Sequence, residues 1–197
     1  MAYDSAATKA RLLDAAYDEF VRVGLAGARV DRIAKAASAN KQAIYLYFGS
    51  KEELFDAVMT DRLRVLADAA PVTADDLPRY AGALFDALVA DPGLQRLSQW
   101  RALEFPEASE AEIESHVAKA TEIAESYGVP LTLATDLMMI ALGAAMAWNA
   151  TAERIRNPLG EPAEQRTARH RQSVVTAVTA LTGALTAPAD AAAKSAP

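Results

Sequence analysis

The chain has 197 residues, contains no cysteine and carries a formal net charge of −6. A chain of this length can bury a sizeable core, as one small and one medium domain or as one continuous helical body. The lack of cysteine excludes disulfides and thiolate chemistry, and the acidic total argues against a protein that coats nucleic acid indiscriminately.

The charge is spread unevenly along the chain. Residues 1–51 carry eight Lys/Arg against five Asp/Glu, whereas residues 52–197 carry twelve against twenty-one. A locally basic N-terminal part can form a phosphate-binding surface despite the acidic total. The N-terminus has no apolar run resembling a secretion signal, and the longest apolar run, Leu137–Trp148, is shorter than the roughly 18 to 20 residues that cross a bilayer. We therefore expect a cytoplasmic protein in which that run is a buried helix.

The first predicted helix covers about residues 6–23. Apolar side chains recur along one stripe of it until Gly24, a residue that favours the end of a helix. A second, short helix begins at Val30, because apolar residues follow it at three, four and seven positions. The pattern is interrupted at Ala39 and Asn40. Asn40 is a good N-cap, since its side-chain oxygen accepts from the exposed N–H groups of a following turn.

The third predicted helix starts near Lys41 and stops at Gly49. Ile44 and Phe48 are four residues apart and can turn inward together, which leaves the polar and tyrosine positions free to project outward. The run Ser50-Lys-Glu-Glu53 is a capping box that starts a fourth helix. Two short helices joined by a tight turn match the helix-turn-helix, whose second helix enters the major groove of DNA.

The segment Tyr45–Leu54, YLYFGSKEEL, resembles the signature of the TetR family of bacterial transcriptional regulators. The resemblance extends from about Arg11 to Met59 and includes the Ile33-Ala34 pair. Two positions depart from the family pattern. Ala28 and Arg29 stand where the family usually has a Ser or Thr cap, and Ser38 stands where it usually has glycine. We expect the first helix of the motif to be capped differently and its turn to be slightly altered.

Residues of the motif are candidates for contact with DNA. Lys41 and Gln42 can reach base edges, where lysine favours the acceptors of guanine and glutamine binds adenine. The tyrosine hydroxyls and Lys51, at a helix N-terminus, suit phosphate oxygens, although the tyrosines could instead be packing residues and Arg29 a plain surface charge. The resemblance adds Ala43 at the reading face. The predicted DNA-binding set is Arg29, Asn40, Lys41, Gln42, Ala43, Tyr45, Tyr47 and Lys51.

The rest of the chain is predicted to be helical as well. No stretch alternates with period two, and caps and breakers give helices of about 51–70, 74–90, 92–104, 110–126, 130–156 and 163–185. These predictions describe an all-α protein of about nine helices. We expect a DNA-binding domain at residues 1–50, a helical effector-binding and dimerisation domain at 51–186, and a disordered, alanine-rich tail at 187–197.

Signatures of enzymes and cofactor sites are missing. Neither histidine has a neighbouring constellation, and no Gly-rich phosphate loop, metal-spaced cluster or nucleophile elbow occurs, so we expect neither enzyme activity nor a metal or cofactor. By analogy with the family, aromatic, methionine and polar residues in the middle of the body would form an effector pocket, although each could instead be an ordinary core residue. This predicted set is Phe85, Trp100, Leu103, Phe105, His116, Met138, Met139, Met146 and Trp148.

The last two predicted helices suit an interface between two copies. The helix from Pro130 is rich in small residues that allow close approach, and the final helix presents a row of Val and Leu. The resemblance also implies dimerisation through these helices, and the alternative is an ordinary intrachain core. The predicted interface set is Ala141, Ala145, Ala152, Val174, Val178, Leu181 and Leu185.

These observations predict a homodimeric DNA-binding regulator of TetR type. We expect a repressor that leaves a pseudo-palindromic operator when a small apolar or amphipathic effector binds its body. Two alternatives stay open at this point: a regulator of the same fold controlled by a protein partner or by nothing, and a helical enzyme.

Overall fold

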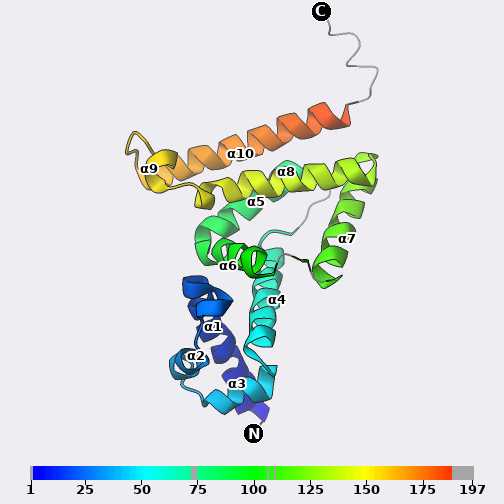
Figure 1. Ribbon diagram of the computed structural model, residues 1–197. Coiled ribbons are helices and arrows are strands. Elements are labelled where there is room, and N and C mark those ends of the chain that lie inside the picture. Colours follow the sequence, from blue (N-terminus) through cyan, green and yellow to red (C-terminus); the bar gives the residue numbers. More distant parts are fainter. Residues whose placement is uncertain (1, 72–74, 106, 109, 188–197) are drawn as a thin grey trace, which may run out of the picture. The chain divides into compact units, whose positions relative to one another are not determined.

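The computed structural model describes residues 2–71, 75–105, 107–108 and 110–187, which form ten helices and no strand (Figure 1). This result confirms the all-α prediction for that part of the chain. Most of the predicted tail lies outside the described residues, as does Ser109, just before the predicted helix at 110–126. The helices are α1 (Ala2–Gly27), α2 (Val30–Ala36), α3 (Lys41–Phe48), α4 (Lys51–Ala69), α5 (Leu77–Ala90), α6 (Pro92–Glu104), α7 (Glu110–Tyr127), α8 (Leu131–Ala150), α9 (Glu153–Arg156) and α10 (Ala163–Thr186).

The described helices divide into two compact units that do not follow chain order. Unit 1 contains Met1–Leu66 and Asp91–Ala108, and unit 2 contains Ala67–Ala90 and Ser109–Pro197. Unit 1 therefore combines α1, α2, α3 and most of α4 with α6, which follows α5 in the sequence. Helical periodicity alone does not reveal that α6 belongs to unit 1 while α5, which precedes it, belongs to unit 2.

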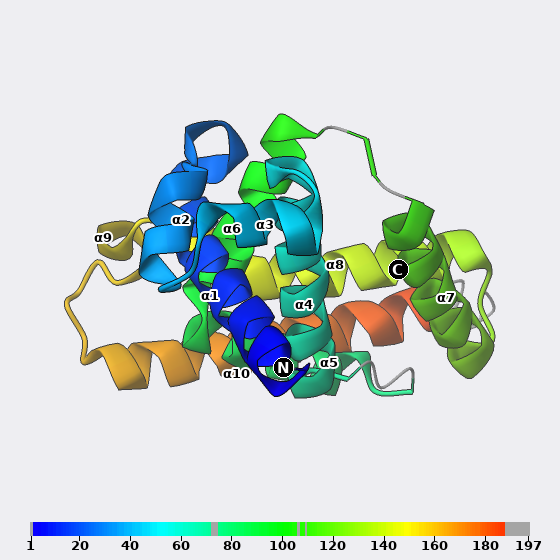
Figure 2. The same cartoon turned by 90° about the horizontal axis from the view of Figure 1, so that it is seen from below.

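The core of unit 1 is formed by apolar residues from α1 to α4 together with Leu97 of α6. Helices α2, α3 and α4 follow one another around α1 (Figure 2). The rings of Phe20 on α1 and Phe55 on α4 meet edge to face with centroids 5.0 Å apart, and Phe105, just after α6, lies 6.0 Å from Phe55. Aromatic burial of this kind contributes strongly to a small core.

Gly24 interrupts α1 as the sequence predicted. Its φ of 70° and ψ of −178° are not helical, and the chain makes only one further turn before Gly27. A side chain on Gly24 would collide with α6, because a Cβ there would lie 2.8 Å from the Trp100 ring and 2.4 Å from an oxygen of Glu104. Glycine thus serves here both for its positive φ and for close packing.

Unit 2 is built on α5, which packs against both α8 and α10, while α7 packs against α8 (Figure 1). Two polar contacts fix α5: the Asn149 Nδ2 donates to Leu88 O at 2.7 Å, and the Arg171 Nε donates to Asp86 at 2.8 Å. Because α8 and α10 both cover α5, the apolar residues that face α5 form the core of this unit.

The long helix predicted from 130 to 156 is in fact two helices, and this part of the prediction was wrong. Helix α8 ends at Ala150, Thr151 is extended, and α9 follows as a single turn. The Arg156 Nη1 donates to Trp148 O at 3.0 Å and so satisfies one of the carbonyls at the end of α8. The apolar pattern continues across the break, which explains why periodicity missed it.

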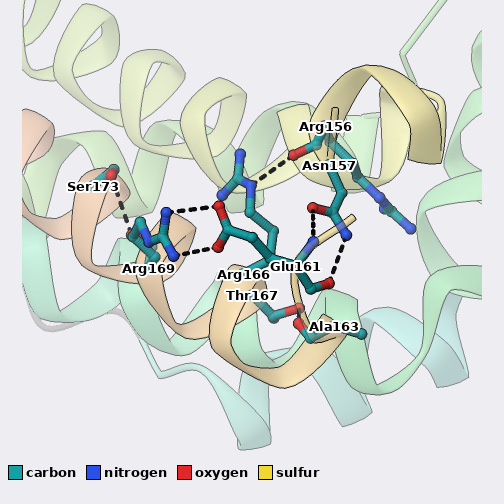
Figure 3. A network of polar contacts seen from close by, with 8 residues as sticks. All are labelled: Arg156, Asn157, Glu161, Ala163, Arg166, Thr167, Arg169 and Ser173. Carbon is teal, nitrogen blue, oxygen red and sulfur yellow. Dashed lines mark hydrogen bonds and ion pairs between the residues drawn. The ribbon is translucent and has the colours of Figure 1, made fainter. Parts of the chain in front are cut away.

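A network of polar contacts then leads the chain into α10 (Figure 3). The Asn157 side chain closes the loop, since its Nδ2 donates to Glu161 O at 2.8 Å and its Oδ1 accepts from Glu161 N at 2.9 Å. The Arg166 Nε donates to Arg156 O at 2.6 Å, and the Arg169 guanidinium forms a bidentate pair with the Glu161 carboxylate. The turn is therefore fixed by side chains on both sides of it.

Helix α8 is long and apolar enough to span a bilayer, judged by length and composition alone. An 18-residue window within it has a mean hydropathy of 1.6, and a third of that window is buried. Core helices of helical proteins meet the same criterion, and α8 packs against α5, α7 and α10. We interpret α8 as such a core helix with an additional exposed apolar face.

Candidate nucleic-acid interface

The α2–turn–α3 segment has the geometry of a helix-turn-helix (Figure 2). Helix α2 ends at Ala36, and Ser38 in the turn adopts a φ of 51°, the only positive φ among the described non-glycine residues. Asn40 caps α3, because its Oδ1 accepts from Gln42 N at 2.9 Å. The predicted Asn40 cap is thus present in the structure, and Ser38 has a backbone conformation that favours glycine, while the expected alteration of the turn stays a prediction.

Helix α3 presents one face to the core and the other to solvent. Ile44 and Phe48 are buried, whereas Lys41 and Gln42 are exposed at its N-terminal end. Tyr45 is 47% exposed. Leu46 is 81% exposed, but a single exposed leucine is ordinary on a protein surface and carries no inference by itself. A helix with a free polar and aromatic face suits entry into the major groove.

The remaining predicted DNA-binding residues lie around this face. Arg29 is exposed at the start of α2, while Ala43 and Tyr47 are half-buried against the core. The Lys41 ammonium forms a 3.0 Å ion pair with Asp31 of α2, and this contact raises the pKa of Lys41. Seven of the eight predicted residues therefore lie on α3 or at the N-cap positions of α2 and α3, and one base-reading candidate, Lys41, is paired with an acid.

Lys51 differs from the others because its ammonium points back into unit 1. The Nζ donates to Leu25 O at 2.7 Å and to Ala28 O at 3.5 Å. These carbonyls belong to the turn between α1 and α2, so Lys51 ties the start of α4 to that turn. Its predicted role at phosphate stays a prediction, since these donors already have partners.

Two carboxylates hold the same turn and were not identified from the sequence. Glu104 on α6 accepts from Ala26 N at 3.1 Å, and Glu19 on α1 accepts from Arg29 N at 3.2 Å. Burial by itself raises the pKa of Glu19, but hydrogen bonds from Arg22 and the Arg29 N–H, together with the charge of nearby arginines, lower it below its usual value. Glu19 is therefore an ionised buried acid.

The nine predicted effector residues are divided between the two units. Trp100, Leu103 and Phe105 belong to unit 1, where the Trp100 Nε1 donates to Val21 O at 3.3 Å. The other six lie in unit 2, where the rings of Phe85 and Trp148 are in contact, with centroids 6.0 Å apart. Met138 is buried and Met146 half-buried, while His116 and Met139 are exposed.

Next to Phe85 and Trp148 lies His170 of α10, which the sequence analysis had left without a role. Its ring is 4.9 Å from Trp148 and 5.6 Å from Phe85. Its Nε2 is buried and, among the described residues, has no hydrogen-bond partner. Burial, followed by the charge of Arg166, lowers the pKa of His170. No group of three or more metal-ligating side chains occurs in the described part of the chain.

The predicted dimer interface needs a correction. Four of its members have less than a twentieth of their surface exposed within a single chain, so they pack helix to helix inside unit 2 and leave almost nothing for a second copy: Ala141, Ala145, Val174 and Val178. Ala152 is exposed but lies beyond the end of α8. Leu181 and Leu185 are each 43% exposed on α10, and Leu131 and Met139 are exposed on α8. The free apolar surface on these two helices thus includes two predicted residues, Leu181 and Leu185, and two that were not predicted, Leu131 and Met139.

Both parts of the chain match known family models. Residues 12–58 match the bacterial regulatory proteins of the tetR family, and residues 76–179 match the tetracyclin repressor-like C-terminal domain. The HTH-type transcriptional repressor SCO4008 of Streptomyces coelicolor is 46% identical over 121 residues, which are 60% of this chain and 63% of that protein. The HTH-type transcriptional repressor NicS of Pseudomonas putida is 42% identical over 52 residues, 26% of this chain and 24% of that protein. The matches thus span less than two thirds of these curated relatives.

Solved structures show the same fold. SCO4942 from Streptomyces coelicolor is 31% identical, with a TM-score of 0.76 over 88% of this chain and 97% of that one. SCO7222, a TetR from Streptomyces coelicolor, has a TM-score of 0.62 over 89% of this chain and 96% of that chain. At 22% identity it demonstrates likeness of fold alone.

Proposed function

Because the chain belongs to the TetR family of bacterial regulatory proteins, we propose that it is a homodimeric DNA-binding repressor released from its operator by a small effector. The observation that carries this proposal is the free face of α3, where exposed polar and aromatic side chains stand on a helix that is capped and packed from behind. We take residues 1–50 as the DNA-binding domain, with Lys51 as a further DNA contact just beyond it, and residues 51–186 as the effector-binding and dimerisation domain of a protein that acts in the cytoplasm.

Contacts with DNA divide into those that read bases and those that position the protein. Lys41 and Gln42, at the exposed start of α3, would reach base edges, and Ala43 would meet a thymine methyl. Asn40 and the tyrosines Tyr45 and Tyr47 would approach phosphates with Arg29, while Lys51 would do so with the one N–H that Leu25 and Ala28 leave over.

Operator selection tests the DNA-binding part of the proposal. Duplexes selected by the protein from a random library should contain an inverted repeat, because a two-fold dimer presents two identical reading helices. Gln42→Ala should then relax preference at particular base pairs by roughly 1–3 kcal/mol. Gln172→Ala, which removes the same side chain from the exposed face of α10, serves as the control. Unchanged base preferences in Gln42→Ala would show that the reading face is misplaced.

The dimer would form through the exposed apolar positions of α8 and α10. Leu131, Met139, Leu181 and Leu185 are all large apolar side chains that unit 2 leaves uncovered. Covering such a surface with a second copy removes apolar area from water, which favours association. One helix-turn-helix also makes too few contacts for specific binding on its own.

Charge substitution on this surface tests the dimer. Leu181→Glu should convert the protein to a monomer in light scattering and weaken operator binding, because a carboxylate would be buried without a partner. Leu159→Glu is the matched control, since Leu159 is 84% exposed on the α9–α10 connection. If the Leu181→Glu protein stays dimeric, the interface does not include this part of α10.

The effector would bind within unit 2, and its chemistry would be apolar or amphipathic. Phe85 and Trp148 supply an aromatic surface, and the buried His170 Nε2 beside them is free to accept or donate one hydrogen bond. Apolar walls with a few polar groups are typical of small-molecule sites. A thermal-shift screen of hydrophobic compounds checks this: a compound that stabilises the protein should also weaken operator binding, and operator should weaken its binding by the same factor.

A further inference from the structure

The first helix of the reading motif lacks a side-chain cap of its own. Arg29 occupies the N-cap position of α2 with extended backbone angles, and its side chain makes no capping hydrogen bond. Helices normally satisfy some of their first N–H groups with a Ser, Thr, Asp or Asn side chain at this position. Something else must therefore hold the start of α2 against α1.

Glu19 of α1 holds the start of α2 in place. Its side chain is one of the few charged groups in the core of the described chain, with the residue only 7% exposed. One oxygen, Oε1, accepts from the Arg29 backbone N–H at 3.2 Å and lies 3.5 Å from the Arg32 guanidinium. The other, Oε2, accepts from Arg22 on its own helix. A single carboxylate thus joins α1 to both the backbone and a side chain of α2.

The link continues from α2 to the helix that reads DNA. Asp31, between the two residues that Glu19 contacts, pairs with Lys41 at the start of α3 at 3.0 Å. Ile33 and Ala34 of the same short helix are buried in the core of unit 1. A seven-residue helix has little stability of its own, so its placement depends on such contacts.

We propose that Glu19 is a positioning residue for DNA reading: its buried carboxylate binds the N-cap N–H and the Arg32 guanidinium of α2 and so sets the orientation of α2 and, through it, of α3. The inference rests on the proposed DNA binding. Removing one partner of a buried ion pair is costly when the other charge stays buried, but the arginines that pair with Glu19 are half exposed and can turn to water, so the cost to the whole fold should be small. A positioning role therefore predicts that global stability and DNA affinity respond differently, which a merely structural role would not produce.

The first experiment uses Glu19→Leu in the full chain. Affinity for a duplex selected by the wild-type protein should fall roughly three- to tenfold, while the midpoint of chemical unfolding changes little. Hydrogen exchange of the Val30–Ala36 amides should accelerate severalfold, and that of α6 should not. Asp14→Asn is the control, because it also removes a carboxylate of α1 that pairs with an arginine, Arg62, without touching α2.

Wild-type affinity and wild-type exchange in Glu19→Leu would overturn the proposal. Should Glu19→Leu not fold, Glu19→Gln replaces it: faster α2 exchange supports the proposal and wild-type exchange refutes it. A wild-type protein that selects no duplex would instead refute the proposed function, and the exchange measurements would still decide the role of Glu19.

Discussion

Ser38 is strained in the turn of the motif, and relieving the strain should stabilise unit 1. Its φ of 51° lies in the left-handed region, and no hydrogen bond of its exposed side chain is present to be lost on substitution. For a residue with a Cβ this conformation costs about 1–2 kcal/mol. Glycine avoids that cost but loses about 0.5–1 kcal/mol more conformational entropy on folding. Ser38→Gly should therefore raise the free energy of unfolding by about 0.5–1 kcal/mol.

Urea unfolding monitored by tryptophan fluorescence measures this change. The chain has two tryptophans, Trp100 in unit 1 and Trp148 in unit 2, so a Trp148→Phe background leaves a probe of unit 1 alone. Ser38→Ala is the matched control, because it removes the hydroxyl and keeps the Cβ, and it should give no gain. Equal stabilities of the glycine and alanine variants would refute the strain argument.

Three further predictions concern a glycine, an ion pair and a histidine. Gly24→Ala should destabilise unit 1 by about 2–4 kcal/mol in urea unfolding, because φ is 70° and the new Cβ would lie 2.8 Å from Trp100; a loss below about 1 kcal/mol would contradict this. Asp31→Asn should release Lys41 from its 3.0 Å ion pair and make the salt dependence of DNA binding up to about one unit steeper, even if the loss of the link between α2 and α3 lowers the affinity itself. Burial lowers the pKa of His170, so below about pH 6.5 the unfolded chain binds a proton at this residue more readily than the folded chain does. The free energy of unfolding should therefore be highest above about pH 6.5 and fall below it. His170→Gln should make the thermal midpoint change less between pH 8 and pH 5.

Local features of the chain could be predicted because they depend on residues close in sequence. The Asn40 cap, the Gly49 stop and the Ser50 capping box each follow from the chemistry of one turn, and the structure has them: Glu53 N, for example, donates to Ser50 Oγ at 3.0 Å. The bounds of most helices follow for the same reason. The exposed face of α3 could also be predicted, because burying Ile44 and Phe48 leaves the other side of the helix outward.

Features that depend on tertiary packing could not be predicted in this way. The acid that holds the start of α2 is ten residues before Arg29 in sequence, and no local pattern connects Glu19 with it. Small residues on α8 suggested an interface between copies, but Ala141 and Ala145 use their small size to let helices approach within one chain. The same pattern serves either purpose, and only the packing of α8 on α5 distinguishes the two.

The discontinuity of unit 1 affects how the protein can fold while it is being synthesised. Domains generally fold as units as the chain leaves the ribosome, at about 5–20 residues per second. Helices α1 to α4 emerge first, but three residues that complete their packing belong to α6, which is made only after α5. These residues are Leu97 in the core and Trp100 and Glu104 against Gly24. The DNA-binding helices are therefore without their α6 contacts for on the order of a few seconds, and part of their apolar core is exposed during that time. During that interval the nascent chain would be open to chaperones and proteases, so substitutions at the α1–α6 contact should reduce the yield of protein in cells more than their effect on equilibrium stability suggests.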